Sequence, residues 1–217
     1  MLKNADISNP PLGISKVVHG RHRPDGRVRY LVDPKGKDGE EATPERVVLK
    51  RWRRRSVPGY VFGGARLSPT VWRAVGLVFG TDARSIVALA ESEVESEIFK
   101  SQGLLRRRKL SLPNPKVVYR IFQCLGIQRL TKILNRHLID DGGKTSGTPD
   151  LFLYQLKIET RRATFFIFVE VKKSDEPLKP HQRAEIEFLR QIGVPAREFR
   201  FSESRRSVNQ PRPRVSK

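Results

Sequence analysis

The stretch FVEVKKSDEPLKPHQ, residues 168–182, decides the fold that this sequence predicts. It continues a run of aromatic and β-branched residues that starts at Phe165, and such a short apolar run is typical of a strand covered on both faces. The strand also carries Glu170 and Lys172, whose side chains point the same way because they lie two residues apart. An acid and a base on a covered strand need a chemical reason, because buried charges are costly unless they are paired.

A second acid belongs to the same constellation. Twenty residues before Glu170, Asp150 opens an expected strand over 150–158, which forms a hairpin with an expected strand over 164–172. Antiparallel pairing brings Asp150 beside Glu170 and Lys172. Carboxylates are ligands that Mg²⁺ or Mn²⁺ prefers, and such a metal lowers the pKa of a bound water and neutralises charge on a phosphate. The constellation predicts metal-dependent phosphodiester hydrolysis, although the Glu170–Lys172 pair alone is also compatible with an ion pair at a sheet edge.

The composition indicates a polyanionic partner. The chain has 217 residues, 43 Lys and Arg against 23 Asp and Glu, and a formal net charge of +20. Nucleic acid is the commonest partner of so basic a protein. The lone Cys124 excludes an internal disulfide and a cysteine-based zinc site, which favours an intracellular setting, nuclear in a eukaryote and otherwise cytoplasmic with the DNA. No apolar run reaches the length of a membrane span, so no membrane partner is expected.

The order of turn residues and apolar runs predicts four regions. Residues 1–56 form a small β-rich basic domain, with a hairpin over 15–32 and a third apolar run at 47–49. The glycine-rich residues 57–80 are expected to be a linker. Residues 81–202 form the domain that carries the constellation, beginning with a helix over 82–101 and including a helix over 178–192 and a strand over 196–201. The basic, proline-rich tail 203–217 is expected to be disordered.

These motifs resemble a known family of nucleases. Pro149-Asp150 followed by Glu170-Val171-Lys172 resembles the PD-(D/E)XK signature of restriction-endonuclease-like nucleases. More narrowly, GTPDLFL, FVEVKKSDEPLKPHQ and EIEFLRQIGV resemble the VRR-NUC domain, the catalytic module of the Fanconi-associated nuclease and of small phage-type nucleases. The resemblance covers roughly residues 84–202. It implies an α/β fold with a restriction-endonuclease-like core, a mixed sheet flanked by helices.

The resemblance also implies roles for individual residues. Asp150 and Glu170 would bind the metal, Mg²⁺ or Mn²⁺, and the backbone carbonyl of Val171 would complete its shell. Lys172 would assist the attacking water. Gln182, on the helix that follows, corresponds to a glutamine of the family.

The family uses one more glutamate, from an upstream helix, and here the sequence leaves a choice. Glu91 shares a helical stripe with Val94 and Ile98, so it is expected to face inward and to bind the metal. Glu95 or Glu97 is the alternative. A solvated acidic helix face is the preferred interpretation for Glu93 and Glu95, and it competes with the metal role for Glu91.

The predicted function is a metal-dependent deoxyribonuclease acting on branched, flapped or junction DNA in repair or recombination. The alternative is a non-catalytic DNA-binding or chromatin-associated protein on a decayed nuclease fold, and a homodimer is kept open. The expected DNA contacts are basic residues outside the carboxylate constellation: Arg53, Arg54, Arg55, Arg106, Arg107, Arg108, Lys109 and Lys173.

A weaker resemblance concerns the N-terminal region. GRHRPDGRVRYLVDPKGKDGEEATPE resembles the core of a chromodomain. The positions of the family's aromatic methyl-lysine cage hold Pro34, Lys37 and Pro44, so contact with nucleic acid is the better expectation there.

Overall fold

The computed structural model describes residues 12–18, 20–22, 28–33, 39–140 and 147–203. The turn expected at 24–26, the cage positions Pro34 and Lys37, and all of the predicted tail beyond residue 203 lie outside these residues. No helix in the described part of the chain is long and apolar enough to cross a membrane.

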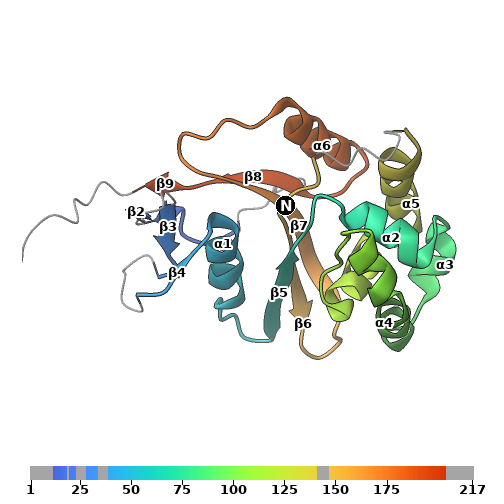
Figure 1. Cartoon of the computed structure of the whole chain (residues 1–217). Coiled ribbons are helices and arrows are strands. Elements are labelled where there is room, and N and C mark those ends of the chain that lie inside the picture. Colours follow the sequence, from blue (N-terminus) through green and yellow to red (C-terminus); the bar gives the residue numbers. More distant parts are fainter. Residues whose placement is uncertain (1–11, 19, 23–27, 34–38, 141–146, 204–217) are drawn as a thin grey trace, which may run out of the picture.

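A mixed four-stranded sheet forms the centre of the molecule (Figure 1). Its order is β5 (Tyr60–Arg66), β6 (Leu151–Lys157), β7 (Ala163–Lys172) and β8 (Ala196–Arg200). Strands β5, β6 and β7 pair antiparallel, and β8 runs parallel to β7. The predicted hairpin, its mixed sheet and the strand that follows are therefore confirmed.

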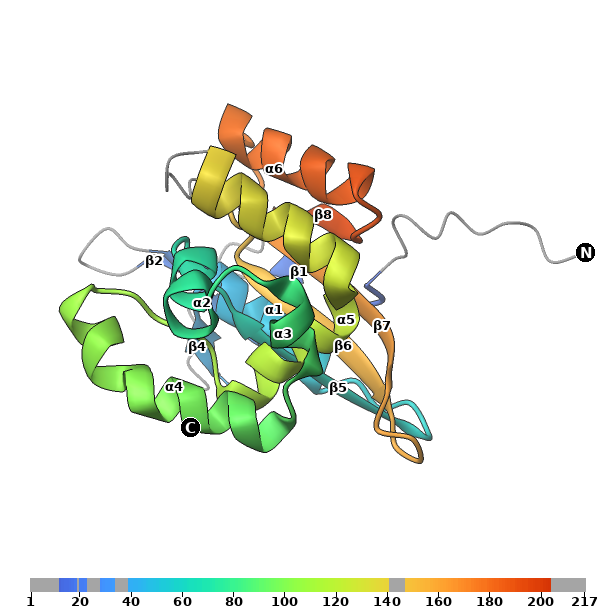
Figure 2. The same cartoon turned by 90° about the vertical axis from the view of Figure 1, so that its right-hand side faces the viewer.

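Helices cover the sheet on both faces, as the α/β class predicts. The group on one face consists of α2 (Val71–Phe79), α3 (Ala83–Ala88), α4 (Glu91–Arg107), α5 (Pro115–Leu134), the π-helix η1 (Asn135–Asp140) and α6 (Pro180–Gln191). Figure 2 looks onto this group. The single helix expected over 82–101 is wrong, because Leu89 adopts an extended conformation and ends α3. The Glu93 carboxylate then accepts a hydrogen bond from the Ala90 amide at 2.6 Å and starts α4.

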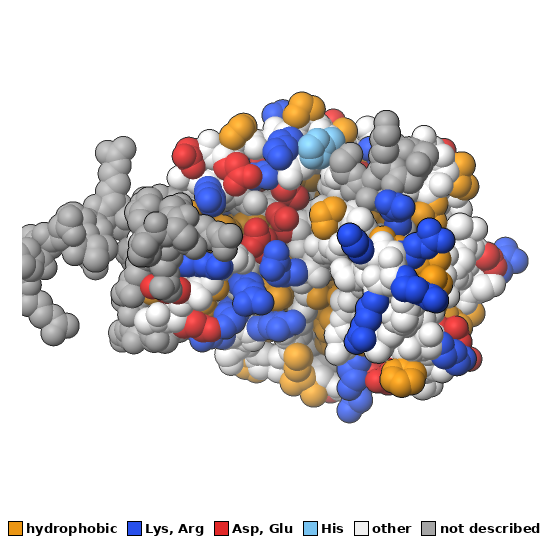
Figure 3. Space-filling view, viewed as in Figure 1, with side chains coloured by type: hydrophobic (Ala, Val, Ile, Leu, Met, Phe, Trp, Pro, Cys, Tyr) orange, Lys and Arg blue, Asp and Glu red, His pale blue; other side chains and the backbone are white. Residues whose placement is uncertain are grey.

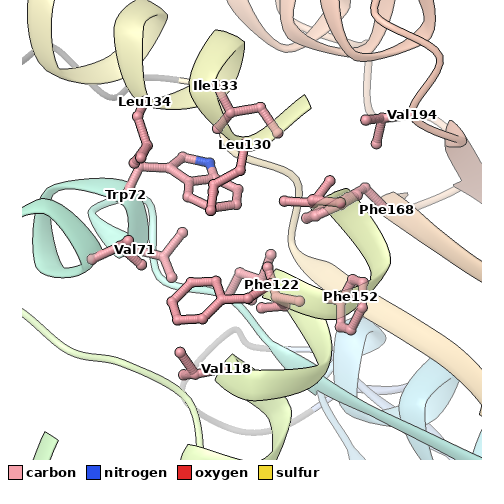
Figure 4. Close-up of a cluster of buried hydrophobic side chains, with 14 of the residues drawn as sticks. Val71, Trp72, Val118, Phe122, Leu130, Ile133, Leu134, Phe152, Phe168 and Val194 are labelled. Carbon is pink, nitrogen blue, oxygen red and sulfur yellow. The ribbon is translucent and has the colours of Figure 1, made fainter. Parts of the chain in front are cut away.

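The core between this helical group and the sheet is aromatic. Trp72, Phe122, Phe152 and Phe168 are all buried there, surrounded by aliphatic side chains of α5 (Figure 4). Phe152 and Phe168 come from adjacent strands, with ring centroids 5.2 Å apart. Because both sit on the pleat side that faces the helices, the alternate residues of β6 and β7 face the opposite side.

That opposite side is covered by α1 (Pro44–Arg53), which the sequence analysis missed. The buried positions of α1 include Val47, Val48 and Trp52, so the apolar run at 47–49 is one face of a helix rather than a strand. The Trp52 ring packs edge-on against Phe62 at 5.0 Å, and its indole donates to the Gly63 carbonyl at 2.8 Å. The expected domain boundary near residue 56 is thus wrong, because α1 packs against the central sheet and shares its core.

The expected linker over 57–80 is also wrong, since it contains β5 and α2. Two of its glycines, Gly63 and Gly64, are required because a neighbouring strand approaches closely. A Cβ on Gly63 would lie 2.3 Å from the Tyr154 ring, and one on Gly64 would lie 2.5 Å from the Phe152 carbonyl oxygen. A glycine-rich stretch can therefore be an inner part of a sheet wherever a neighbouring strand leaves no room for a side chain.

The remaining N-terminal elements are short strands tied to α1. Antiparallel β2 (Gly20–His22), β3 (Val28–Leu31) and β4 (Glu41–Ala42) form a small sheet, which confirms the expected pairing of the hairpin arms. Strand β1 (Val17–Val18) pairs in parallel with β9 (Ser202–Glu203). Arg51 of α1 holds these N-terminal segments in place through its guanidinium group. It donates hydrogen bonds to the carbonyls of Val32 at 2.7 Å, of Ser15 at 2.8 Å and of Val17 at 2.8 Å.

We predict that α1 and the sheet unfold together. Trp52→Ala should lower the free energy of unfolding by about 3–5 kcal/mol, because it removes a buried aromatic side chain from the contact. Arg54→Ala, which removes an exposed ion pair with Glu40, should cost less than about 1 kcal/mol. Urea unfolding followed by circular dichroism measures both. Two separate transitions, with only the first shifted by Trp52→Ala, would contradict a shared core.

Candidate active site

The constellation that the sequence predicts forms where β6 begins beside the end of β7. The register pairs Leu151 with Val169, so Asp150 lies just outside β6 at the height of Glu170 and Val171. The Val171 amide donates to Asp150 Oδ2 at 2.8 Å, which fixes this carboxylate at the sheet end. The structure therefore brings together the two acids that the hairpin predicted would meet.

Glu170 is the centre of a polar network. Its side chain is 2% exposed, and its Oε1 lies 3.0 Å from the Lys172 ammonium. The Gln182 side-chain amide donates to the same oxygen. Gln182 Oε1 in turn accepts from the Lys179 amide at 3.1 Å, at the start of α6. Lys172 also contacts Glu176 at 3.2 Å, so its charge is shared between two carboxylates.

The surroundings of this network disfavour the ionised form of both carboxyl groups. Burial raises the pKa of Glu170 to about 7, and the negative charge of Asp150 contributes to the rise. Burial also raises the pKa of Asp150. For Lys172, burial favours the neutral amine, but the hydrogen bonds and charges of Glu170 and Glu176 outweigh it and raise its pKa. Ionising both carboxyl groups is therefore costly at this buried position, and a bound cation would stabilise their ionised forms.

A third acid, Glu45, lies at this end of the sheet, where the sequence analysis expected Glu91. Glu45, in the first turn of α1, lines a hollow of about 410 Å³ together with Asp150 and Glu170. Its charge is one of the contributions that raise the pKa of Asp150. Arg66, at the end of β5, lies 4.0 Å from Glu45 on the rim. Figure 3 shows acidic side chains gathered at the centre of this face, with Lys and Arg on both sides.

Glu91 lies elsewhere, so the structure does not bring it to the constellation. It pairs with Arg120 at 3.7 Å and lines a different hollow, which includes Ala163 at the opposite end of β7. The alternative Glu97 pairs with Lys100 at 2.8 Å on the surface of α4. The stripe of Val94 and Ile98 correctly indicated a buried helix face, but that face belongs to the helical core rather than to the metal end of the sheet.

The oxygen donors present fit a hard divalent cation. Glu45, Asp150 and Glu170 line one hollow, and Val171 lines it too. Mg²⁺ and Mn²⁺ take carboxylate, carbonyl and water ligands of this kind. Within the described residues no three acidic, His or Cys side chains are already gathered closely enough to hold a metal. Lys172 and Gln182 occupy a Glu170 oxygen instead, so they would have to share it with an incoming ion.

The expected nucleic-acid contacts divide into exposed and structural residues. Those at the end of α4 and just beyond it are exposed: Arg106, Arg107, Arg108 and Lys109. Lys173 lines the hollow itself. Arg54 is exposed and pairs with Glu40. Arg53 is exposed but donates to the Gly64 carbonyl at 2.5 Å, and Arg55 lies over the rings of Trp52 and Phe62, at 5.0 and 4.7 Å from their centroids. Arg55 therefore stabilises the docking of α1.

A buried ionic cluster behind the hollow was not found from the sequence. Glu185, 1% exposed on α6, lies 2.8 Å from His137 Nε2 and 2.9 Å from Arg136 Nε. Burial alone would raise the pKa of Glu185, but His137 and Arg136 lower it overall. The cluster holds α6 against η1. It thereby helps to position Gln182, which lies about one helical turn before Glu185 on α6. A Cβ on Gly147 would lie 3.1 Å from the Glu185 side chain, so the loop before Asp150 packs directly on this cluster.

The pKa of Glu170 gives a prediction for stability against pH. A carboxyl whose pKa is raised on folding stabilises the fold below its unfolded pKa, near 4.5, and this contribution is lost as the pH rises through about 7. Without divalent metal, Glu170→Gln should therefore gain stability relative to the wild type as the pH goes from about 4.5 to 7, by on the order of 3 kcal/mol. Thermal or urea unfolding across this range measures the difference, and a constant difference would contradict the raised pKa.

Comparisons with known proteins identify a family for the chain. The sequence profile of the VRR-NUC domain matches residues 88–202. No protein of curated function matches the chain by sequence. Two solved structures of similar fold are paFAN1 bound to 2-nt and to 1-nt 5′-flap DNA with a gap, with TM-scores of 0.48 and 0.47 and 19% and 18% identity. Each comparison covers 76% of this chain and 36% of paFAN1, so the chain corresponds to about a third of that protein.

The profile match spans more than half of the chain and contains Asp150, Glu170, Lys172 and Gln182. It begins after α1 and β5, which supply Glu45 and one edge of the hollow. The chain belongs to the VRR-NUC domain family.

Proposed function

We propose that the chain is a divalent-metal-dependent nuclease of the PD-(D/E)XK type that hydrolyses phosphodiester bonds in flapped or otherwise branched DNA. The observation that carries this proposal is the convergence of Asp150 and Glu170 with Lys172 at the end of β7, in a hollow that also contains Glu45. DNA repair or recombination is the setting in which such substrates arise. The comparisons give no support to a homodimer.

The division of labour follows from the contacts. Glu45, Asp150 and Glu170 would hold Mg²⁺ or Mn²⁺, which when bound supplies Lewis acidity and lowers the pKa of a coordinated water. Lys172 is kept charged by Glu170 and Glu176, so its ammonium can orient a water or stabilise the charge that develops on the phosphate. Gln182 positions the Glu170 carboxylate through its amide, because its own oxygen is fixed by the Lys179 amide.

The charge on the surface supports a nucleic-acid substrate. Lys and Arg lie on both sides of the acidic hollow in Figure 3, over α1 and over α2. The exposed residues from Arg106 to Lys109 and the rim residues Arg66 and Lys173 would contact backbone phosphates. The acids would bind metal and the surrounding cations would bind the substrate, which is the arrangement that a nuclease needs.

The rival is a DNA-binding protein on a decayed nuclease fold. It differs from the enzyme in its need for the constellation: binding alone does not require three acids and a lysine in one hollow. A decayed site is expected to lose the repulsion between its acids, whereas here burial and neighbouring charge raise the pKa values of Asp150 and Glu170.

Cleavage of labelled DNA tests the proposed function. The wild type should cut 5′-flap DNA with Mg²⁺ or Mn²⁺ and not with EDTA. Parallel reactions with single-stranded, duplex and four-way-junction DNA measure its substrate preference. Asp150→Asn and Lys172→Met should each lower the rate by at least about a hundredfold, because they remove a ligand or the ammonium from the reacting centre. Lys100→Ala, on the surface of α4, is the matched control and should cut normally. Tight binding without cleavage under any metal would support the rival instead.

A second pair of variants tests the assignment of the third acid. Glu45→Gln should lower the cleavage rate by at least about tenfold and shift the metal dependence to higher concentration, because it removes one oxygen ligand from the hollow. Glu91→Gln should leave cleavage intact, because Glu91 lies in the other hollow with Arg120. The reverse result, with Glu91 essential and Glu45 dispensable, would contradict the assignment. Rates measured over a Mg²⁺ titration decide between them.

A further inference from the structure

A second hollow lies at the opposite end of the central hairpin from the catalytic constellation. Its volume is about 660 Å³, and its lining includes three arginines, Arg120, Arg161 and Arg162, and two aromatic side chains, Tyr119 and Phe166. It forms where the turn between β6 and β7 meets α5 and the start of α4. Figure 2 shows this hairpin turn projecting from the sheet, away from α6.

The charge of this hollow is positive. Glu91 is the one carboxylate among its described lining residues, and it pairs with Arg120. The Arg120 side chain is 18% exposed and lies over the Tyr119 ring, 5.2 Å from the centroid, so its guanidinium is held in place. Arg161 and Arg162 are exposed at the hairpin turn. A hollow with this excess of guanidinium groups is complementary to phosphate.

Backbone hydrogen bonds define the conformation of the turn that carries Arg161 and Arg162. Arg161 has φ of 53°, a left-handed conformation that costs energy for any residue other than glycine. Its amide donates to the Lys157 carbonyl at 2.8 Å, and the Arg162 amide donates to Thr160 Oγ1 at 3.3 Å. Among the described residues, Lys109 is the other non-glycine residue with positive φ. A left-handed residue is an ordinary feature of a short hairpin loop, and here it belongs to a turn that exposes two consecutive arginines.

The strand itself gives the distance between the two sites. From Ala163, which lines the arginine hollow, to Glu170, the strand advances seven residues. At roughly 3.3 Å per residue this is about 23 Å. Duplex DNA advances about 3.4 Å per base pair, so the same distance corresponds to about seven base pairs.

We propose that the arginine hollow binds the phosphate backbone of a duplex arm of the substrate, about seven base pairs from the scissile phosphate. The inference rests on the proposed function, because it takes the constellation at the end of β7 as the place where the scissile phosphate lies. The hollow sets the arm length at which the protein gains affinity. Glu91 competes with the DNA phosphates for Arg120 and moderates that affinity.

Binding to flap DNAs with duplex arms of graded length, from about 4 to about 16 base pairs, tests the proposal. Fluorescence anisotropy in EDTA measures binding without cleavage. The wild-type affinity should rise stepwise once the arm exceeds about seven base pairs. Arg161→Ala/Arg162→Ala should remove the step and weaken long-arm binding about tenfold or more. The plot of log affinity against log salt should become less steep, its negative slope falling in magnitude by about two. Short-arm binding and short-arm cleavage should stay unchanged.

Two controls make the result specific. Glu91→Gln should strengthen long-arm binding, because it releases Arg120 from its ion pair. Lys100→Ala removes one exposed charge from α4 outside the hollow and should have no arm-length dependence.

The proposal is overturned if the double variant binds all arm lengths as the wild type does, or weakens all of them equally. Failure of the proposed nuclease function is a separate result. A protein that shows the arm-length step but never cuts DNA would support arm binding by the hollow and contradict the nuclease function. A protein that cuts DNA without the step would support the nuclease function and contradict arm binding.

Discussion

The antiparallel pairing of β6 with β7 is the constraint on which the rest of the structure depends. It places the Asp150 carboxylate on the Val171 amide at 2.8 Å, beside Glu170 and Lys172. Every other element either supports this pair of strands or adds a group to its end. The helical core fixes one face through Phe152 and Phe168, and α1 covers the other face through Trp52. A shift of one residue in the register would turn Glu170 and Lys172 to the wrong face.

Polar and charged partners explain how the buried acids Glu170 and Glu185 are tolerated. Glu170 is 2% exposed, yet Lys172 and Gln182 both bond to it, so it is paired before any metal arrives. Burial still raises the pKa of Glu170 to about 7 in spite of these contacts. The Glu185 cluster with His137 and Arg136 provides the rigid support for α6 behind it. The site is thus stable enough to fold and charged enough to attract a cation.

The sequence was most informative where the signal is local. The continuous apolar run from Phe165 to Val169, the Pro149-Asp150 opening and the helix that carries Gln182 are all patterns within a few residues, and the structure has each element. It was least informative for contacts between distant segments. Glu45 was missed because the stretch around it was interpreted as β structure, although Pro44 followed by an acid is a recognised helix start. Glu185 and His137 are 48 residues apart, and neither carries a local signal of the other.

The location of a bound Mn²⁺ ion tests the central claim most directly. Anomalous diffraction from crystals of the chain soaked with Mn²⁺ identifies the ion and its ligands. The account predicts a peak in the hollow at the end of β7, within coordination distance of Asp150 and Glu170 and reached by Glu45, directly or through water. A peak beside Glu91 and Arg120, or no peak in this hollow at saturating Mn²⁺, would contradict it.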